Sequence, residues 1–546
     1  MAKEMNINLI PKDKLVLADR GDHIKDQKFD DKPIGYFKDA WRRFCKNKAS
    51  IVAAIIILMI VIFAIVTPFF NTGTGTSFDT RYAKKGPRNV FLSQFGIATG
   101  DVDKGFNERG FIYEIAKGIG AYNSTGKIPT LGQAVADGGN LQPITGINSI
   151  TEKQQGTQTN MMYDASVDEY VSVGFIYLQV SKTEYEKMVA WQEENGIQLL
   201  YPLIDSNNDF CFDAKDANCW YKTDDKGQPM YTTTSKTGRV KANYIEYNQV
   251  GEIVLEDNYL RYPYGWPLDP DKEASEGDLA YFVYQGGGNT PETAERKIRT
   301  LYYNYYQYKH DMAEPEFIFG TDVSGYDLAQ RIAMGLRLSL LFSVCIFAIN
   351  FVLGAMYGAV EGYYGGTCDL LLEFVAYILS GIPFVVVSTL FQIHLAAKVG
   401  PIPSLLFAFV LTGWIGTASL VRTQFYRFKN QEYVMAARTL GAKDKRIIWK
   451  HIFPNTLGTI ITSSVLSIPG VIFSESMLTY LGIVNLNSKT STSLGTILAQ
   501  AEGIWSSKPH VMLFPALFLS LLMICFNLFG NGLRDAFNPS LRGSED

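Results

Sequence analysis

The chain has 546 residues, 47% of them hydrophobic, and a formal net charge of −4. This length is too great for one compact domain, and a mean hydropathy of +0.01 averages two very different kinds of sequence. Long uncharged stretches and long polar stretches follow one another, which excludes a simple soluble domain, and we expect no nucleic-acid partner.

Six apolar stretches each have about the length that an α-helix needs to cross a hydrocarbon core of roughly 30 Å. They are residues 49–70, 338–360, 374–397, 399–421, 455–474 and 509–533. A lone stretch could form a buried core helix, but six in one chain predict a polytopic helical membrane protein. We therefore expect an all-α membrane domain of about six transmembrane helices.

Basic residues indicate the orientation of these helices. Four of them stand directly before the first stretch: Arg42, Arg43, Lys46 and Lys48. Positive residues favour the cytoplasmic side, so the N-terminus is predicted to be cytoplasmic. Alternation then places residues 71–317 outside the cell and returns the basic loop 422–454 and the C-terminus to the cytoplasm.

Five parts are expected along the chain. They are a cytoplasmic tail with an interfacial helix (1–48), the first transmembrane helix (49–70), an extracytoplasmic α+β domain (71–317), a membrane core with five transmembrane helices (318–537) and a cytoplasmic tail (538–546). The α+β domain is long enough to bury a core of its own.

Within the α+β domain the sequence predicts strands at residues 171–180, 197–203, 240–255 and 279–284. Ser181 is predicted to cap a helix that runs through Glu194 and ends at Gly196. Residues 290–291, a Thr-Pro pair, are predicted to open a second helix that reaches about Tyr308.

An acidic segment of this domain has oxygen-bearing side chains at the spacing of a calcium loop: Asp205, Asn207, Asp209, Asp213 and Asp216. Phe210 stands where such a loop needs Gly for a sharp turn, so a solvated acidic loop is the preferred interpretation and a calcium site the alternative. Cys211 and Cys219 lie in the same segment. In an oxidising compartment their close spacing favours a local disulfide over two free thiols.

Four residues of the membrane core are candidates for translocation or gating. Glu373 and Glu475 are acidic residues near the ends of apolar stretches, where either a substrate contact or a hydrated interfacial position would explain them. Pro383 and Pro469 are predicted to kink their helices, which gives either a hinge or ordinary membrane packing.

The basic loop between the fourth and fifth stretches is the most informative segment. Its candidate docking residues are Glu432, Met435, Ala436, Ala437, Gly441 and Pro454. Two small residues leave room for another protein on a helix face, and the glycine supplies a break or a left-handed cap. An ordinary amphipathic helix-turn-helix on the membrane surface is the alternative.

This loop resembles the cytoplasmic coupling loop of ABC-importer permeases, in which two Ala precede a Gly and a Pro follows. Met435 replaces the family's usual acidic residue, and Glu432 lies one turn earlier. Residues 319–327 are similar to the Gly-Thr-Asp entry to the core helices in the dipeptide, oligopeptide and nickel importer family, of the oligopeptide permease C type. Tyr326 replaces that family's usual Arg, and the domain at 71–317 is absent from its usual pattern.

The resemblance implies a permease of a binding-protein-dependent ABC importer with a type I permease fold. Such a permease lies in a bacterial cell membrane and carries dipeptides or oligopeptides into the cytoplasm. Its implied partners are a second homologous permease, two cytoplasmic ATPases that bind ATP and Mg, an extracytoplasmic substrate-binding protein and membrane lipid. No phosphate-binding Gly-x-x-x-x-Gly-Lys-Ser/Thr motif occurs in the chain, so we expect a transport subunit and not an enzyme.

Two other functions remain open at this point. One is a membrane-anchored extracytoplasmic receptor or sensor, in which the α+β domain binds a ligand. The other is an ABC importer for nickel or another small solute.

Overall fold

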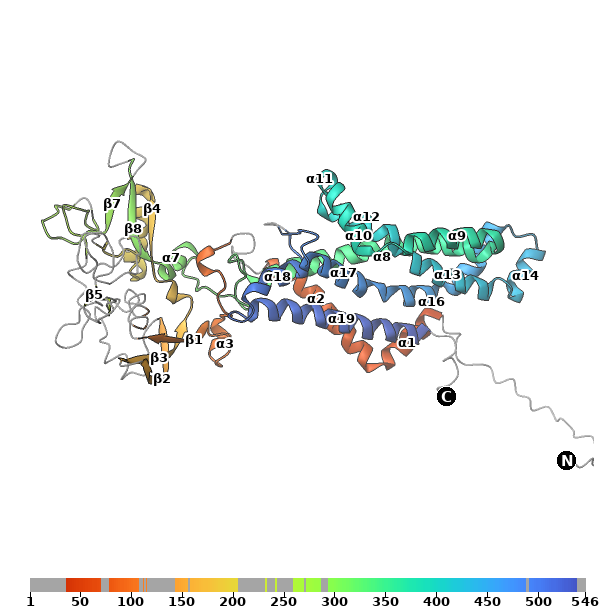
Figure 1. Ribbon diagram of the computed structural model, residues 1–546, viewed down its shortest axis with the longest axis horizontal. Coiled ribbons are helices and arrows are strands. Elements are labelled where there is room, and N and C mark those ends of the chain that lie inside the picture. Colours follow the sequence, from red (N-terminus) through yellow and green to blue (C-terminus); the bar gives the residue numbers. More distant parts are fainter. Residues whose placement is uncertain are drawn as a thin grey trace, which may run out of the picture.

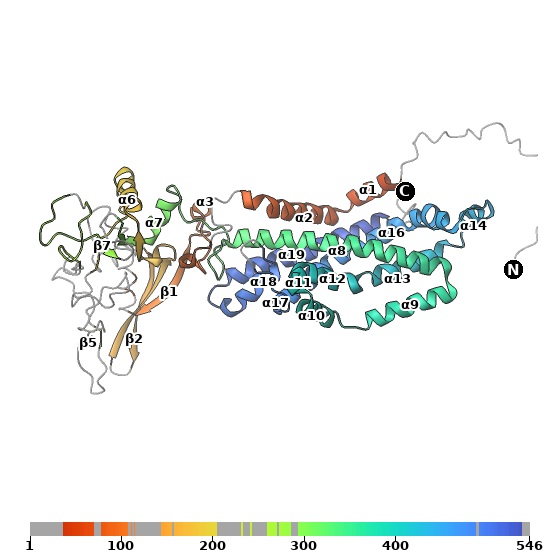
Figure 2. The ribbon, with the colours of Figure 1, turned by 90° about the horizontal axis from the view of Figure 1, so that it is seen from above.

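The computed structural model describes residues 36–69, 78–107, 111, 114, 143–155, 158–204, 231–232, 241–242, 259–269, 272–285, 293–487 and 491–537. The described elements form two parts. A helical bundle extends along the long axis, and a β-containing part lies beyond one end of it (Figures 1 and 2). We call the described residues between 78 and 317 the head segment.

Five helical runs are long and apolar enough to cross a membrane, by length and composition. They are α2 (Lys48–Val66), α8 (Leu328–Tyr364), α12 (Pro401–Gly413) continued by α13 (Ile415–Phe428), the run Asp444–Tyr480 and α19 (His510–Phe537). The run Asp444–Tyr480 contains α15 (Asp444–Arg446), a π-helical stretch (Ile447–Ile452), α16 (Phe453–Val465) and α17 (Ser467–Tyr480). With 37 residues, α8 is about 55 Å long and exceeds the thickness of a hydrocarbon core.

The third predicted helix is not one straight span. It is a pair, α9 (Gly366–Ser380) and α10 (Phe384–His394), bent by 72° at a short break. Pro383 is the N-cap residue of α10, and a proline there cannot continue the preceding helix because it lacks an N–H. The expectation of about six spans therefore becomes five continuous spans, or six if the bent pair counts as one.

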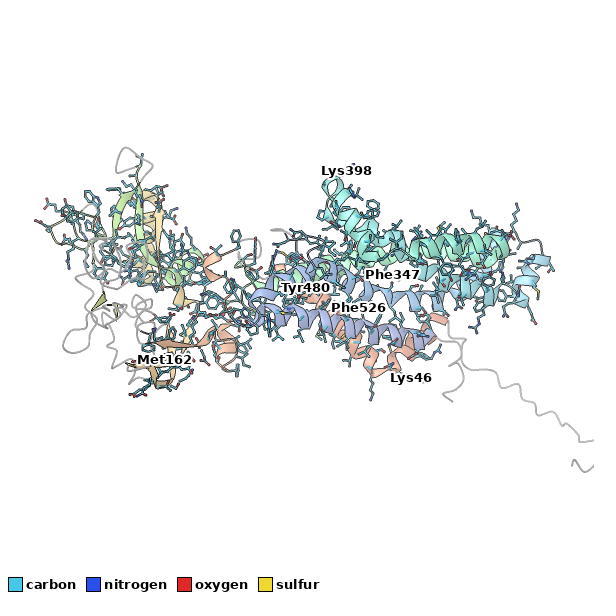
Figure 3. The ribbon with its side chains drawn as sticks, viewed as in Figure 1. Lys46, Met162, Phe347, Lys398, Tyr480 and Phe526 are labelled. Atoms are coloured by element: carbon cyan, nitrogen blue, oxygen red, sulfur yellow. The ribbon has the colours of Figure 1, made fainter. Side chains whose placement is uncertain are left out.

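Shorter helices complete the bundle: α1 (Tyr36–Lys46), α11 (Ala396–Val399), α14 (Glu432–Thr439) and α18 (Leu494–Ala501). The helix expected before the first span is α1, and its Phe44 ring packs edge-on against Phe529 of α19 at 5.5 Å. Figure 3 labels Lys46, the last residue of α1, near one end of the bundle, and Met162 on the sheet that lies beyond the other end.

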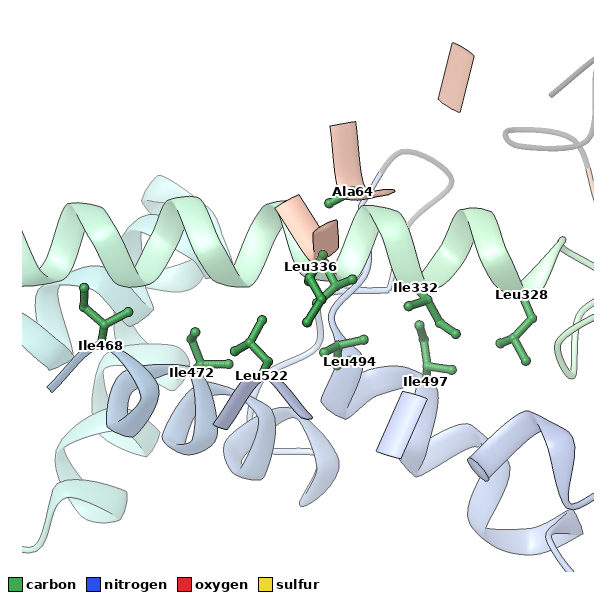
Figure 4. Packing of buried hydrophobic residues seen from close by; sticks show 10 residues of the cluster. Ala64, Leu328, Ile332, Leu336, Ile468, Ile472, Leu494, Ile497 and Leu522 are labelled. Atoms are coloured by element: carbon green, nitrogen blue, oxygen red, sulfur yellow. The ribbon is translucent and has the colours of Figure 1, made fainter. Parts of the chain in front are cut away.

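The largest apolar core of the bundle joins α2, α8, α17, α18 and α19. In Figure 4, Ile332 and Leu336 of α8 point toward Leu494 and Ile497 of α18, with Leu522 of α19 beside them. All of these side chains are buried. The short helix α18, which lies outside every predicted span, is thus part of the packed interior.

The head segment contains three small antiparallel sheets. Its strands are β1 (Asp101–Asn107), β2 (Ile144–Gln155), β3 (Gln158–Asp168), β4 (Phe175–Val180), β5 (Tyr231–Thr232), β6 (Lys241–Ala242), β7 (Phe282–Gln285) and β8 (Glu295–Leu301). The orders are β1-β3-β2, β4-β8-β7 and β5-β6. Three helices accompany them: α3 (Val90–Ser93), α6 (Lys182–Asn195) and α7 (Tyr302–Lys309).

The predicted α6 is confirmed. The Ser181 hydroxyl accepts the Glu184 N–H at 3.3 Å, and the helix ends where Gly196 has a φ of +66°. The predicted second helix is wrong over most of its length, because Glu295–Leu301 is β8, the middle strand of its sheet. Pairing with a strand on each side fixes this segment more strongly than its local helix signal does.

The strand expected at 197–203 is also wrong. The N–H groups of Leu199 and Leu200 donate to the Gln192 side chain at 2.8 and 2.9 Å, and only single bridges form, at Tyr201 and Ile204. The strand expected at 171–180 begins only at Phe175, since a 3-10 turn precedes it. The strand expected at 279–284 is β7, shifted toward the C-terminus, and most of 240–255 lies outside the described residues.

The head segment is fixed to the bundle by the glycine-rich turn before α8. The Lys85 N–H donates to the Thr321 hydroxyl at 2.8 Å, and the Asp79 N–H donates to the Gly325 carbonyl at 3.1 Å. Asp322, at the centre of this turn, is buried and lies 3.5 Å from the buried Arg331 guanidinium. The turn is therefore a structural joint between the two parts.

Gly325 is needed in this joint, and Gly325→Ala is expected to weaken it. Gly325 has a φ of +91°, and a Cβ there would lie 2.0 Å from the Asp79 carbonyl oxygen. Backbone strain and the clash together should cost at least about 2 kcal/mol. Thermal unfolding of the purified protein measures the loss. Gly86→Ala is the matched control, because its Cβ would meet nothing closer than 3.8 Å. Equal melting of the two variants would contradict the prediction.

A buried ion pair provides a second attachment, between Glu169 in the head segment and Lys508 in the loop before α19. Burial raises the pKa of Glu169, but the hydrogen bond from Lys508 and the charges of Lys508, Lys85 and Lys104 outweigh it and hold this pKa below its ordinary value of 4.5. The second carboxylate oxygen accepts the Gly86 N–H at 3.1 Å.

This lowered pKa gives the attachment a pH dependence. A carboxyl with a lowered pKa stabilises the fold above its ordinary pKa, and this contribution is lost as the pH falls through the lowered value. Lys508→Met should therefore cost about 2 kcal/mol at pH 7, and its difference from wild type should shrink as the pH falls below 4.5. Limited proteolysis of the head segment against pH measures this. Lys104→Met, which removes a longer 3.9 Å pair, should have a smaller effect.

Candidate coupling site and polar groups of the bundle

The helix α14 forms the end of the bundle opposite the head segment (Figures 1 and 2). Its two sides differ. Val434 and Ala437 are buried against the bundle, whereas Ala436 is exposed, Met435 is 51% exposed and Leu440 is 88% exposed. The end of the helix thus presents apolar side chains that nothing in the described part of the chain covers.

The glycine after α14 ends it as expected. Gly441 has a φ of +80°, and its N–H donates to the Arg438 carbonyl at 3.0 Å. The Ala442 N–H donates to the Ala437 carbonyl at 3.1 Å. A glycine in the left-handed region closes the helix without a side-chain penalty and lets the chain turn back into α15.

An apolar cluster holds α14 in place. Val434 packs with Phe425 of α13 and with Ile447, Ile448 and Ile452 of the π-helical stretch. Pro454 is the second residue of α16, one residue beyond this stretch. A proline lacks an N–H and crowds the carbonyl four residues earlier, and the wider π turn gives the room that Pro454 needs inside a continuous run.

Polar contacts connect the same region to α8. The Tyr363 hydroxyl donates to the Asp444 carboxylate at 2.6 Å, and the Arg438 guanidinium donates to the Tyr363 hydroxyl at 3.4 Å. Movement of α14 is therefore linked to the end of α8 through side chains of both helices.

An ionic cluster lies just behind this end, between α8, α9 and α13. Arg422 donates to Asp369 at 2.6 and 2.8 Å and to Glu373 at 2.9 Å from two nitrogens, and Glu361 lies 3.4 Å from its Nε. The Tyr426 hydroxyl also donates to Asp369, at 2.6 Å. One guanidinium thus holds three carboxyl groups together.

Glu373 therefore has a definite partner that the sequence did not reveal. Arg422 is the first charged residue after the fourth apolar stretch, which was the only signal for it. The carboxylates of Glu361, Asp369 and Glu373 are close enough to hold a metal ion. Because the Arg422 guanidinium already supplies the positive charge among them, we assign no metal here.

Glu475 lies inside the bundle and not at an interface. It is 1% exposed, and its carboxylate accepts the Ser339 hydroxyl of α8 at 2.7 Å. Neighbouring hydroxyls continue a buried polar network, since Ser493 donates to Thr479 at 3.0 Å. Glu475 thus links α17 to α8. A hydrated interfacial position, which was one of the two expectations for Glu475, does not agree with this burial.

The two candidate hinge prolines differ. Pro383 stands at the 72° bend between α9 and α10. Pro469 lies in the first turn of α17, where a proline is tolerated, within a run that passes as one span. The structure thus has a sharp bend at Pro383, and near Pro469 it has the short break at Leu466 between α16 and α17.

The remaining predicted sites lie outside the described residues. These are the proposed disulfide pair Cys211 and Cys219 and the proposed calcium ligands Asp205, Asn207, Asp209, Asp213 and Asp216. Both stay predictions. Among the described residues, Cys45, Cys345, Cys368 and Cys525 are free thiols.

Comparison with known proteins connects this architecture to a family. Residues 350–543 match the binding-protein-dependent transport system inner membrane component, and residues 35–87 match the N-terminal TM domain of oligopeptide transport permease C. Over 230 residues the chain is 40% identical to the dipeptide transport system permease protein DppC of Bacillus subtilis, covering 41% of this chain and 69% of that protein. The chain belongs to the dipeptide and oligopeptide ABC permease family.

Other relatives agree. The permease is 40% identical over 225 residues to the oligopeptide permease OppC of Haemophilus influenzae, covering 41% of this chain and 70% of the relative. It is 33% identical over 271 residues to the dipeptide permease DppC of Lactococcus lactis, and the alignment covers 50% of this chain and 74% of that protein. It is therefore a multi-pass permease subunit of a binding-protein-dependent transport system.

Most of the head segment lies between the two matched ranges of the permease, in residues 88–349. Among solved structures, an inward-facing MetNI methionine ABC transporter chain aligns with a TM-score of 0.32 and 16% identity, over 38% of this chain and 96% of that one.

Proposed function

We propose that this permease works with a second homologous permease, two cytoplasmic ABC ATPases and an extracytoplasmic substrate-binding protein. ATP and Mg bind the ATPases, and the substrate is a dipeptide or short oligopeptide, as the names of its relatives suggest. The observation that carries this proposal is the exposed face of α14, with Met435, Ala436 and Leu440 uncovered. Exposed apolar residues at the end of a membrane bundle are typical of a protein-binding surface.

We propose that α14 faces the cytoplasm and that the head segment is an extracytoplasmic α+β domain inserted into a type I permease fold. The basic helix α1 lies near the α14 end of the bundle, and the head segment lies at the other (Figures 1 and 2). Positive residues flanking a span favour the cytoplasmic side.

Gating is proposed to pass from α14 to the bent pair α9 and α10. The Arg438 and Tyr363 contact connects α14 to α8, and Arg422 connects α8 and α13 to α9. Pro383 would then act as the hinge of α10, and Glu475 would hold α17 on α8 during the movement. Rigid-body motion of packed helices is a common form of such transitions.

Uptake of a labelled dipeptide tests the function directly. Cells in which this permease is the only peptide permease of its type should accumulate the label, and cells with the chain deleted should not. A protease added outside spheroplasts should cut the head segment and spare the 422–454 loop. Uptake of nickel with no uptake of peptide would overturn the substrate proposal, and cleavage of that loop from outside would overturn the orientation.

A further inference from the structure

The head segment contains a large cleft that the transport function does not explain. Its volume is about 890 Å³, and it lies between α6, β7, β8 and the segments 266–269 and 272–279. Ligand sites in proteins commonly have volumes of 300–1,000 Å³. The cleft is therefore large enough for a small organic molecule or a short peptide.

A buried arginine lies in the wall of this cleft. Arg296 of β8 is only 3% exposed, and its Nε and Nη1 atoms are buried without a hydrogen-bond partner. Its guanidinium instead lies over the rings of Tyr185, Phe282 and Tyr284, at 5.7, 5.3 and 5.5 Å from their centres. Burying a charge that no counter-charge or acceptor satisfies is costly.

Three other inward-facing arginines of the chain have acidic partners. Arg88 lies 2.9 Å from Asp168, Arg331 lies 3.5 Å from Asp322, and Arg422 lies 2.6 Å from Asp369. Arg296 differs from all three. An anion that enters the cleft would supply the missing counter-charge, and a carboxylate forms a strong charge-assisted hydrogen bond with a guanidinium.

The rest of the cleft indicates what else the ligand carries. Aromatic side chains from three segments line it, and these are Tyr185, Trp266, Tyr281 and Tyr284. Trp266 is 37% exposed, so part of its ring is available to a ligand. Aromatic walls bind apolar and aromatic side chains through large contact areas.

The rim of the cleft is acidic. Five acidic residues line it, against two lysines: Glu186, Glu193, Asp269, Glu273 and Asp278, with Lys182 and Lys272. The lysines lie 3.9 Å from Glu186 and 3.4 Å from Asp269. Exposed Glu193 and Glu273 therefore remain to attract a cation.

We propose that this cleft is a peptide-binding site of the permease itself. The C-terminal carboxylate pairs with Arg296, side chains lie among the aromatic rings, and the ammonium group faces the acidic rim at Glu193 and Glu273. The identification of the ligand as a peptide, and not another zwitterion, rests on the peptide cargo of the proposed function. Such a site would hold cargo on the permease, next to its bundle and independently of the binding protein.

Binding of Phe-Ala and of its C-terminal amide to the purified full-length permease tests the proposal. Isothermal titration should show binding of the free acid, and the amide should bind at least tenfold more weakly because it offers no carboxylate to Arg296. This comparison uses the wild-type protein and does not depend on how any variant folds. Equal binding of acid and amide, or no binding of either, would overturn the proposal.

Two variants locate the carboxylate. Arg296→Gln should reduce the affinity for Phe-Ala at least tenfold and abolish the difference between acid and amide. Lys297→Gln is the matched control, because Lys297 is the next residue of β8 and lies over the Tyr177 ring, 4.7 Å from its centre, away from the cleft. Unchanged binding by Arg296→Gln would overturn the assignment.

The binding experiment and the uptake experiment test the cleft and the proposed function separately. Uptake of labelled peptide by cells, with no Phe-Ala binding to the purified permease, would overturn the cleft and leave peptide import in place. Binding that depends on Arg296, in a permease whose cells take up no peptide, would leave the cleft in place and overturn the proposed cargo of the bundle.

Discussion

Arg422→Ala is expected to abolish peptide uptake and to lower the amount of folded permease in the membrane. Arg422 is the one guanidinium that holds Asp369, Glu373 and Glu361 together, and it is 23% exposed. Removing one partner of a largely buried ion pair costs about 3–5 kcal/mol, because the other charges remain buried without compensation. Here three carboxylates would remain.

Thermal unfolding measures the loss of stability in Arg422→Ala, and peptide uptake in the same strain measures the loss of transport. Arg422→Lys should recover part of it, since an ammonium group keeps the charge but cannot bridge two carboxylates in parallel. Glu373→Gln is the matched control. It keeps an oxygen that can accept from Arg422 and leaves the Asp369 pair intact, so it should melt close to wild type. If Arg422→Ala had the melting temperature of the wild type, the cluster would not stabilise the fold.

Second-site changes distinguish repulsion between the carboxylates from the loss of their hydrogen bonds to Arg422. If the harm in Arg422→Ala comes from unpaired carboxylates, adding Asp369→Asn and Glu373→Gln should restore part of the melting temperature. If it comes from lost cross-links between α8, α9 and α13, the triple variant should stay as unstable as the single one. Either result keeps Arg422 as the centre of the cluster.

The sequence predicts the parts of this fold that depend on local pattern. The apolar stretches predict the spans, because a segment that crosses hydrocarbon must satisfy its backbone hydrogen bonds within itself and therefore forms a helix. The Ser181 cap and Gly196 predict the two ends of α6. The short helix α18 was missed because its role in the core comes from contacts with α8 and α19, which no local pattern encodes.

The errors in the head segment have the same origin. Glu295–Leu301 contains residues that favour a helix, but pairing with β4 and β7 makes it a strand. The partners of Arg422 come from α8 and α9, and Arg296 is buried by rings from α6 and β7. These arrangements join residues far apart in the chain, so only the folded structure reveals them.

Leu440→Asp is expected to remove the ATPase from the complex without unfolding the permease. Leu440 is 88% exposed at the end of α14. An apolar anchor at the centre of an interface contributes at least about 2 kcal/mol, or roughly thirtyfold in affinity, and an aspartate placed there adds the cost of burying a charge. Affinity purification from solubilised membranes measures the ATPase recovered per permease.

The two alanines of the same helix should behave differently. Ala436 is exposed, so Ala436→Leu should block the ATPase and leave the melting temperature unchanged. Ala437 is 9% exposed and faces the bundle beside Val434, so Ala437→Leu should lower the melting temperature as well. Gly441→Asp discriminates less well, because aspartate tolerates a positive φ and nothing lies within 4 Å of the added Cβ.

Met312→Asp is the matched control for Leu440→Asp. Met312 is also an exposed apolar residue, 41% accessible, but it belongs to the head segment at the other end of the molecule. The same change of charge there should leave ATPase recovery at the wild-type level. Recovery of the ATPase with both Leu440→Asp and Ala436→Leu would mean that α14 is not its docking surface. The exposed apolar residues of α14 would then be explained by insertion into the membrane surface, since leucine and methionine beside basic residues also suit an interfacial helix.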